Sequence, residues 1–184
     1  MNKIILVNGD IATGKSHFAI ILRDRFNLPL FTKDEFKEAL AEIYPYSTYE
    51  ESHALSIMAM DKLISIFEEK AKSNVDLILE ANFHEEHLKK INDIANKHNY
   101  KQLNLNLVGD PEILFKRYIN RRDNENRHPV HRVNKLNTYE EFKQYIEDRK
   151  KEKMFGQVIT INTNDYFYQS DEILLKRIEE FLNS

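Results

Sequence analysis

A glycine-rich segment near the N-terminus has the residue types and the spacing that hold phosphate groups. Glycine is followed by four other residues and then by glycine, lysine and serine, in the order Gly9, Asp10, Ile11, Ala12, Thr13, Gly14, Lys15 and Ser16. The glycines let the backbone turn tightly, so that its N–H groups face phosphate oxygens. In this pattern the lysine neutralises the β- and γ-phosphates, and the serine hydroxyl reaches Mg²⁺. The segment therefore predicts a site for a nucleoside triphosphate with Mg²⁺, and His17 extends the nucleotide-binding stretch.

Two carboxylates follow later segments that read as strands. Asp34 comes just after the apolar residues 28–32, and Glu80 comes just after residues 75–79. A hydroxyl that attacks phosphorus must lose its proton, so Asp34 is a candidate acceptor base, with Glu35 as the substitute if the register differs. Glu80 is a candidate Mg²⁺ or acceptor contact. The alternative interpretations are an acid in the first turn of a helix for Asp34 and a polar strand end for Glu80.

Arginines gather in one segment after the fourth expected strand. Arg117 and Arg121 are four residues apart and share a helix face, and three more arginines follow at 122, 127 and 132. A phosphoryl-transfer site needs cations over the transferring group and a cover that excludes water. We therefore predict a lid over residues 117–136, with Arg117, Arg121 and Arg127 at the phosphates. A solvated helix face is the alternative.

The elements that must position these residues alternate between strand and helix. Residues 4–7 form an apolar run before the phosphate loop, and residues 15–26 have helical periodicity after it. Further strands are expected at 28–32, 75–79, 101–108 and 157–162, and further helices at 34–43, 49–72, 84–98, 111 onward, 138–153 and 170–182. Such alternation predicts an α/β fold in three layers, a five-stranded parallel sheet with helices on both faces, within one domain over residues 1–184.

The amino-acid composition restricts the kinds of molecule that the chain is expected to bind. The 184 residues include 27 basic and 30 acidic side chains, a net charge of −3, and no cysteine. A chain without basic excess is not expected to bind nucleic acid. The N-terminus has no signal-peptide pattern, and no apolar run is long enough to span a bilayer, so we expect a cytoplasmic protein without a membrane partner. Nothing in the sequence predicts an oligomeric state.

The sequence resembles the P-loop kinase branch that includes chloramphenicol phosphotransferase, the zeta toxins and the kinase domain of polynucleotide kinase. The resemblance is carried by residues 9–16, by Thr32-Lys33-Asp34 and by the arginine-rich stretch that ends Arg127-His128-Pro129. It implies that Asp34 contacts the acceptor hydroxyl and that the lid closes over ATP. It also implies that residues 162–165 form the adenine-side loop.

The sequence thus predicts an ATP-dependent phosphotransferase that acts on a hydroxyl of a small molecule, with an acceptor pocket built from residues 36–53. One alternative is a nucleotide-gated switch without phosphotransfer, which leaves Asp34 and the lid without a role. Residues 134–137 read Asn-Lys-Leu-Asn and lack the aspartate of a guanine-reading motif, which favours ATP. A zeta-type nucleotide-sugar kinase shares all of this chemistry.

Overall fold

One parallel sheet organises the fold. The computed structural model of the chain describes residues 1–124, 128–133 and 136–184. In this part of the chain five strands pair in the order β2-β3-β1-β4-β5, and every pairing is parallel. The strands are β1 (Asn2–Gly9), β2 (Leu30–Thr32), β3 (Leu77–Glu80), β4 (Tyr100–Val108) and β5 (Gln157–Asn162). The predicted sheet is confirmed, with β1 at its centre.

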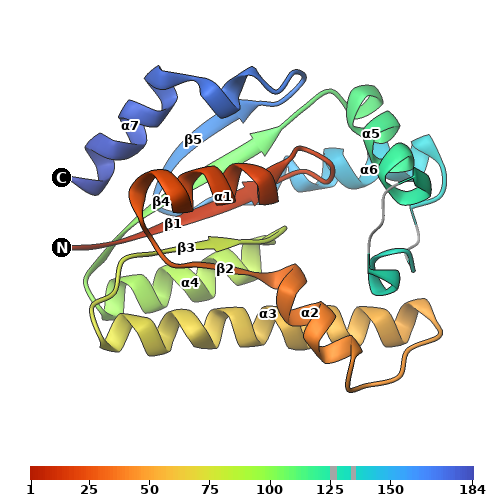
Figure 1. Cartoon of the computed structure of the whole chain (residues 1–184), viewed down its shortest axis with the longest axis horizontal. Coiled ribbons are helices and arrows are strands. Elements are labelled where there is room, and N and C mark those ends of the chain that lie inside the picture. The colour runs from red at the N-terminus through yellow and green to blue at the C-terminus, as the bar shows by residue number, and fades with distance from the viewer. Residues whose placement is uncertain (125–127, 134–135) are drawn as a thin grey trace.

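Helices connect the strands and cover the sheet. Among the described residues they are α1 (Lys15–Phe26), α2 (Lys33–Ala41), α3 (Tyr49–Lys72), α4 (Glu85–Lys97), α5 (Pro111–Asn124), α6 (Tyr139–Arg149) and α7 (Glu172–Leu182), with short 3-10 turns η1 (Pro129–His131) and η2 (Phe167–Ser170). Figure 1 shows α1 and α7 on one side of the sheet and α3 and α4 on the other. The helix expected at 138–153 ends earlier, at Arg149.

Apolar side chains join the three layers through two clusters. Alternate residues of β1 point to opposite faces, as a strand requires. Ile5 and Val7 pack with Phe18 and Leu22 of α1 and with α7, whereas Ile4 and Leu6 pack with α3 and α4. All four β1 residues are fully buried, which confirms that the strand is polar on neither face. A third, smaller cluster joins α5 to α6 beside the phosphate loop.

Along β4, Leu103, Leu105 and Leu107 alternate with Asn104 and Asn106, a pattern that predicts one more exposed face, but part of that face is buried. Asn104 is fully buried and Gln102 is 6% exposed. Asn104 Nδ2 donates to Met154 Sδ, and Gln102 Nε2 donates to the carbonyl of Phe155 at 3.1 Å. The segment after α6 therefore folds over these polar side chains and supplies partners for them. The prediction of a more exposed face is therefore wrong for Asn104, whereas Asn106 is half-buried.

Two smaller expectations also need correction. The helical spacing of the apolar residues in 49–72 includes Met58 and predicts that it faces inward. Met58 is instead 41% exposed, because Ala59, Met60 and Leu63 define the buried stripe. The sequence predicts Ser170 as the cap of the last helix. Asp171 caps α7 instead, since its carboxylate accepts from two backbone N–H groups of the first turn. Within the described residues, no helix has the length and hydropathy to cross a bilayer.

Candidate active site at the carboxyl edge of the sheet

The phosphate loop joins β1 to α1 at the carboxyl edge of the sheet, where open α/β sheets bind ligands. Gly9 has φ +126°, and a Cβ there would lie 2.0 Å from the carbonyl oxygen of Leu107 on β4. Gly14 has φ +85°, and its Cβ would lie 2.7 Å from the hydroxyl of Tyr168. That hydroxyl donates to the carbonyl of Thr13 at 2.8 Å. Both glycines of the motif are thus fixed by backbone conformation and by close neighbours.

Lys15 lies inside the loop rather than in solvent. Its ammonium group donates to the backbone carbonyls of Gly9, at 3.3 Å, and of Asp10, and the residue is 7% exposed. Burial lowers the pKa of Lys15 to about 8, and the nearby Glu80 carboxylate opposes this shift. The side chain keeps its positive charge at neutral pH and places it at the centre of the loop, where the motif requires it.

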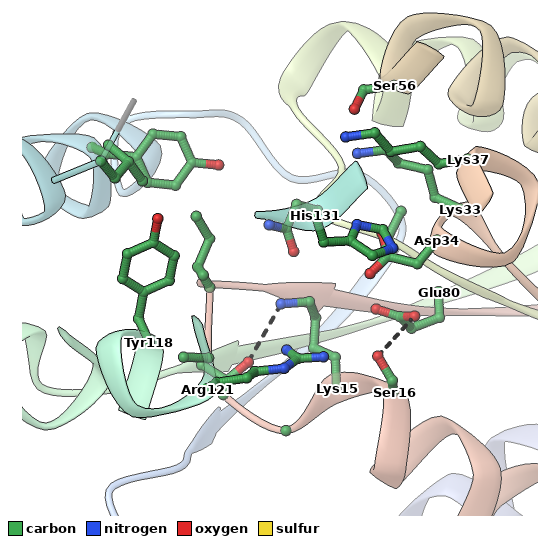
Figure 2. A pocket seen from close by; sticks show the side chains of 18 of the residues that line it. Lys15, Ser16, Lys33, Asp34, Lys37, Ser56, Glu80, Tyr118, Arg121 and His131 are labelled. Atoms are coloured by element: carbon green, nitrogen blue, oxygen red, sulfur yellow. Dashed lines mark hydrogen bonds between the residues drawn. The ribbon is translucent and has the colours of Figure 1, made fainter. Parts of the chain in front are cut away.

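Ser16 and Glu80 meet although 64 residues separate them. Ser16 Oγ donates to Glu80 Oε2 at 3.2 Å (Figure 2). Glu80 ends β3 opposite Val7 of β1, so it lies level with the start of the loop. Burial raises the pKa of Glu80 to about 7, and the charge of Lys15 acts against this increase.

The donor set at this point fits Mg²⁺. A hydroxyl and a carboxylate are hard oxygen ligands, and Mg²⁺ bound with a nucleotide needs only one or two of them beside phosphate and water. Among the described residues no three His, Asp or Glu side chains gather into a larger cage. Ser16 and Glu80 are therefore the residues that would hold the ion.

Asp34 faces the phosphate loop from the other side of a cavity of about 920 Å³. The cavity is also lined by Lys15, Ser16 and Glu80, and Figure 2 shows Asp34 between Glu80 and the lysines of α2. Thr32 caps α2 by accepting from the Glu35 N–H at 3.2 Å, so Asp34 is not the helix cap. Burial dominates the pKa of both Lys15 and Glu80; the negative charge of Asp34 opposes the decrease at Lys15 and adds to the increase at Glu80. The neighbouring Glu35 is exposed.

The predicted lid arginines occupy different places. Arg117 and Arg121 both line the cavity, and Figure 2 shows Arg121 beside Lys15. Arg117 donates to the carbonyls of Thr163 and Asn164, at 2.6 and 2.7 Å, and its guanidinium lies 4.3 Å from the ring centroid of Tyr166. Arg117 therefore holds the loop after β5, on the side expected for the nucleobase. Arg127 lies outside the described residues.

The 3-10 turn η1 docks on α2 and α3. Val130 is fully buried, and its carbonyl accepts from Lys37 Nζ at 3.2 Å and from Ser52 Oγ at 3.0 Å. His131 Nε2 is 2.8 Å from Glu38 Oε1, in a pair whose histidine side chain is 7% exposed. Figure 1 shows η1 reaching from the α5–α6 end of the molecule toward α2. His131 also lines the cavity, so η1 forms part of its wall.

Residues 5–155 match the protein family described as AAA domain. The chain belongs to this AAA domain family. A search of curated proteins finds no match. Among solved structures, a candidate kinase from Chloroflexus aurantiacus is 22% identical with a TM-score of 0.83, over 97% of each chain. Shikimate kinase from Bacteroides thetaiotaomicron is 16% identical, with a TM-score of 0.60 over 99% of each chain. The tunicamycin resistance protein of Deinococcus radiodurans is 18% identical, with a TM-score of 0.58 over 97% of this chain and 96% of its own.

These structures share the fold of this AAA domain, a three-layer P-loop kinase-like arrangement around a parallel sheet. All three are below 25% identity, so the likeness concerns the fold. The phosphate loop, the strand order and the match together identify a nucleotide-binding P-loop protein with kinases among its structural neighbours.

One residue of the AAA domain that sequence reasoning missed is Arg149, which lies beneath the phosphate loop. It is 6% exposed and donates to the carbonyl of Phe83 at 3.0 Å and to Asn8 Oδ1 at 3.3 Å. Its Nε lies 4.0 Å from Asp10 Oδ1. Burial raises the pKa of Asp10, and Arg149 opposes this rise. Arg149 thus supplies the positive charge that keeps a buried carboxylate in the phosphate loop. The partners that tie it to the phosphate loop are distant in sequence, so the sequence does not mark it as part of the site.

Proposed function

We propose that this chain is an ATP-dependent phosphotransferase that moves the γ-phosphate of ATP to a hydroxyl of a small molecule. One observation carries the proposal: Asp34, on a different element from the phosphate loop, faces the same cavity as Lys15 and the Ser16–Glu80 pair. A nucleotide switch does not need a carboxylate there, whereas transfer to a hydroxyl does. Shikimate kinase, with the same fold, supports a small hydroxylated acceptor.

Each side chain has a place in the transfer. The acceptor oxygen forms a bond to the γ-phosphorus while the bond from that phosphorus to the β,γ-bridging oxygen breaks, and ADP leaves with the electron pair. Asp34 orients the acceptor hydroxyl and takes its proton; in a loose transition state the orientation matters most. Lys15 and Arg121 offset the negative charge on the transferring group. When bound, Mg²⁺ adds charge neutralisation and aligns the phosphates, and Ser16 and Glu80 would hold it.

The remaining lid residues fit this assignment. We assign residues 117–136 as the lid, Arg117 to the nucleobase side and Arg127 to the transferring phosphate. The docking of η1 on α2 and α3 would exclude water from the cavity, so that ATP is not lost to hydrolysis. We also place the enzyme in the branch with chloramphenicol phosphotransferase, the zeta toxins and polynucleotide kinase, on the strength of Thr32-Lys33-Asp34 and the arginine-rich lid.

The test is ADP release from ATP and Mg²⁺ with a panel of hydroxylated compounds: nucleosides, nucleotide sugars, aminoglycosides, chloramphenicol, sugars, hydroxy acids and a 5′-hydroxyl oligonucleotide. We expect at least one small-molecule acceptor to raise ADP release in the wild type and not in Asp34→Asn. Slow release that ignores every acceptor and is unchanged in Asp34→Asn would contradict the proposal and favour a nucleotide switch.

A further inference from the structure

The imidazole of His84 lines the cavity with one ring nitrogen bonded to the protein and the other open. His84 is the last residue of the loop between β3 and α4. Its Nδ1 lies 2.6 Å from Glu152 Oε1, just beyond α6, and 3.2 Å from Arg149 Nη1. The contact with the carboxylate is the shorter one, and without a proton on Nδ1 it would bring two lone pairs together. Nδ1 therefore carries the proton and donates it to Glu152.

The position of this ring is fixed from several directions. Arg149 Nη1 lies 3.7 Å from Glu152 Oε2 and so holds the carboxylate. Another nitrogen of the same guanidinium group donates to the carbonyl of Phe83, the residue before His84, at 3.0 Å. The backbone N–H of His84 donates to His87 Nδ1 at 3.1 Å. The end of α6 and the start of α4 therefore orient the imidazole before any ligand binds.

The proton on Nδ1 determines the chemistry of the second ring nitrogen. In a neutral imidazole one nitrogen donates a hydrogen bond and the other accepts one, so Nε2 of His84 is an acceptor. Within residues 1–124, 128–133 and 136–184 this atom has no hydrogen-bond partner, and unlike Nε2 of His98 it is not enclosed by the protein. A polar atom held in one orientation at a cavity wall is suited to select a ligand.

The order of the strands places His84 on the acceptor side of the cavity. β3 lies between β2 and β1, whereas β5 forms the opposite edge of the sheet. Asp34 follows β2 and His84 follows β3, but Arg117 contacts the loop after β5, on the nucleobase side. The group that binds Nε2 is therefore expected to belong to the acceptor and not to the nucleobase.

A second open polar group comes from the same loop. Asn82, two residues before His84, lines the cavity and is half-buried, and its side chain has no hydrogen bond to any described residue. A side-chain amide can both donate and accept. Hydroxyl groups match this pair of neutral groups, because a hydroxyl can donate to the imidazole nitrogen and can form either kind of hydrogen bond with the amide.

We propose, on the basis of the phosphotransferase assignment above, that His84 Nε2 accepts a hydrogen bond from a second hydroxyl of the acceptor, separate from the one that receives phosphate. Glu152 is a positioning residue, because it keeps the proton on Nδ1 and leaves Nε2 able to accept. Asn82 binds a further hydroxyl beside it. The acceptor class is thus a polyhydroxylated compound, a polyol or a sugar, rather than an alcohol with a single hydroxyl.

The test measures binding without turnover. With Mg²⁺ and a non-hydrolysable ATP analogue bound, saturation-transfer NMR compares glycerol with propanol, inositol with cyclohexanol, and glucose with tetrahydropyran-2-methanol. Each pair shares a skeleton and differs in the number of hydroxyl groups. At least one polyol should bind at least about threefold more tightly than its counterpart with one hydroxyl, as expected for the net gain of a hydrogen bond.

Two substitutions separate binding by Nε2 from a structural role of Nδ1. The amide of glutamine reaches about as far along the side chain as Nε2 of histidine, whereas the amide of asparagine reaches only as far as Nδ1. His84→Gln should therefore keep most of the polyol preference, and His84→Asn should lose it. If His84 only tied α4 to α6 through Glu152, asparagine would be the better replacement. Thermal unfolding checks that both variants fold.

A third substitution tests the positioning role of Glu152. In Glu152→Ala, Arg149 can donate to Nδ1 of His84, so the proton should move to Nε2, and the NMR shifts of the two ring nitrogens report this change. Polyol binding should weaken about two- to tenfold. Glu147→Ala, which removes the partner of Lys150 on α6, should change neither the ring nitrogens nor the binding.

Three results would overturn the proposal: a wild-type ring with its proton on Nε2, polyols that bind no better than the single alcohols, or a polyol preference that survives in His84→Asn. An unchanged proton position in Glu152→Ala would remove the positioning role of Glu152. These outcomes concern the subsite alone, because failure of the phosphotransferase assignment would appear as absent phosphoryl transfer in the acceptor panel.

Discussion

The hydroxyl of Ser16 on α1 donates to the carboxylate of Glu80 at the end of β3, with the two oxygens 3.2 Å apart. The pair exists because β3 lies next to β1 in the sheet, in a register that sets Glu80 opposite Val7. A strand from the middle of the chain thereby brings its carboxylate to the first turn of the helix that follows the phosphate loop. The proposed Mg²⁺ site therefore depends on the pairing of β3 with β1.

The first prediction concerns metal binding. Glu80→Gln should weaken Mg²⁺ binding in the presence of ADP about 10- to 100-fold, as the loss of a metal-orienting carboxylate does. Ser16→Ala should act in the same direction. A titration of Mg²⁺ against ADP binding measures both effects, with Glu85→Gln, on the exposed start of α4, as the control. Equal Mg²⁺ affinity in Glu80→Gln and the wild type would place the ion elsewhere.

The same carboxylate predicts a pH dependence. Burial raises the pKa of Glu80 to about 7, and only the ionised form attracts a cation. The fraction ionised increases with pH through this pKa, so Mg²⁺ affinity should increase from pH 6 to pH 8, by up to about tenfold per unit below the pKa. In Glu80→Gln this slope should disappear. A wild-type affinity that is constant over the range would show that Glu80 does not titrate there.

The second prediction concerns the acceptor base. Asp34→Asn should lower kcat about 10²- to 10⁴-fold, the range for loss of a general base, with ATP affinity unchanged. Glu35→Gln is the matched control, since Glu35 adjoins Asp34 but is exposed, and it should retain nearly full activity. Steady-state kinetics with an acceptor found in the panel gives both values. If Glu35→Gln were inactive and Asp34→Asn active, the acceptor base would be Glu35 and not Asp34.

The third prediction concerns closure of the lid. Glu38→Ala removes the partner of His131, whose side chain is 7% exposed, whereas Glu42→Ala removes the partner of His128, whose side chain is 23% exposed. The more buried contact should matter more, because solvent screens exposed pairs. We expect faster amide hydrogen exchange over residues 128–133 and more ATP hydrolysis per transfer in Glu38→Ala than in Glu42→Ala. Similar exchange in both variants would show that the His131 contact does not hold η1.

The fourth prediction concerns the charge beneath the phosphate loop. Arg149→Met should lower the free energy of unfolding by about 3–5 kcal/mol, because it removes the cation with the largest effect on the buried Asp10 carboxylate. Lys150→Met, which breaks an exposed pair with Glu147, should cost at most about 1 kcal/mol. Urea denaturation measures both. Adding Asp10→Asn to Arg149→Met should recover part of the loss; no recovery would mean that Arg149 acts through its other hydrogen bonds.

Much of the fold and part of the site could be predicted because they depend on local requirements. The phosphate loop could be predicted from Gly9 and Gly14, because both positions require glycine: each has a positive φ angle and close backbone or side-chain neighbours. Asp34 could be found because it follows a strand at the edge where ligands bind. Arg149 could not, because its partners Asn8 and Phe83 are 141 and 66 residues away and meet it only through the folded sheet. The burial of Asn104 could not be predicted for the same reason, because its partner, the sulfur of Met154, is distant in sequence.

The location of the acceptor pocket stays a prediction. Within the range expected for the acceptor pocket, residues 36–53, Lys37, Ser52 and His53 line the cavity, and Lys33 and Ser56 line it from just outside that range. Acceptor pockets combine side chains from separate helices, and the packing of α2 against α3 determines which of them meet. Helical periodicity shows which residues share a side of one helix, but not which side of the next helix they face.

The most direct test of phosphotransfer follows the γ-phosphate itself. ATP labelled at the γ-phosphorus is incubated with Mg²⁺ and each compound of the panel, and the label is separated into acceptor, inorganic phosphate and remaining ATP. The account predicts label in at least one acceptor with the wild type and almost none with Asp34→Asn, while both proteins bind ATP equally. Label that stays in ATP, or passes only to inorganic phosphate whatever compound is present, would contradict it.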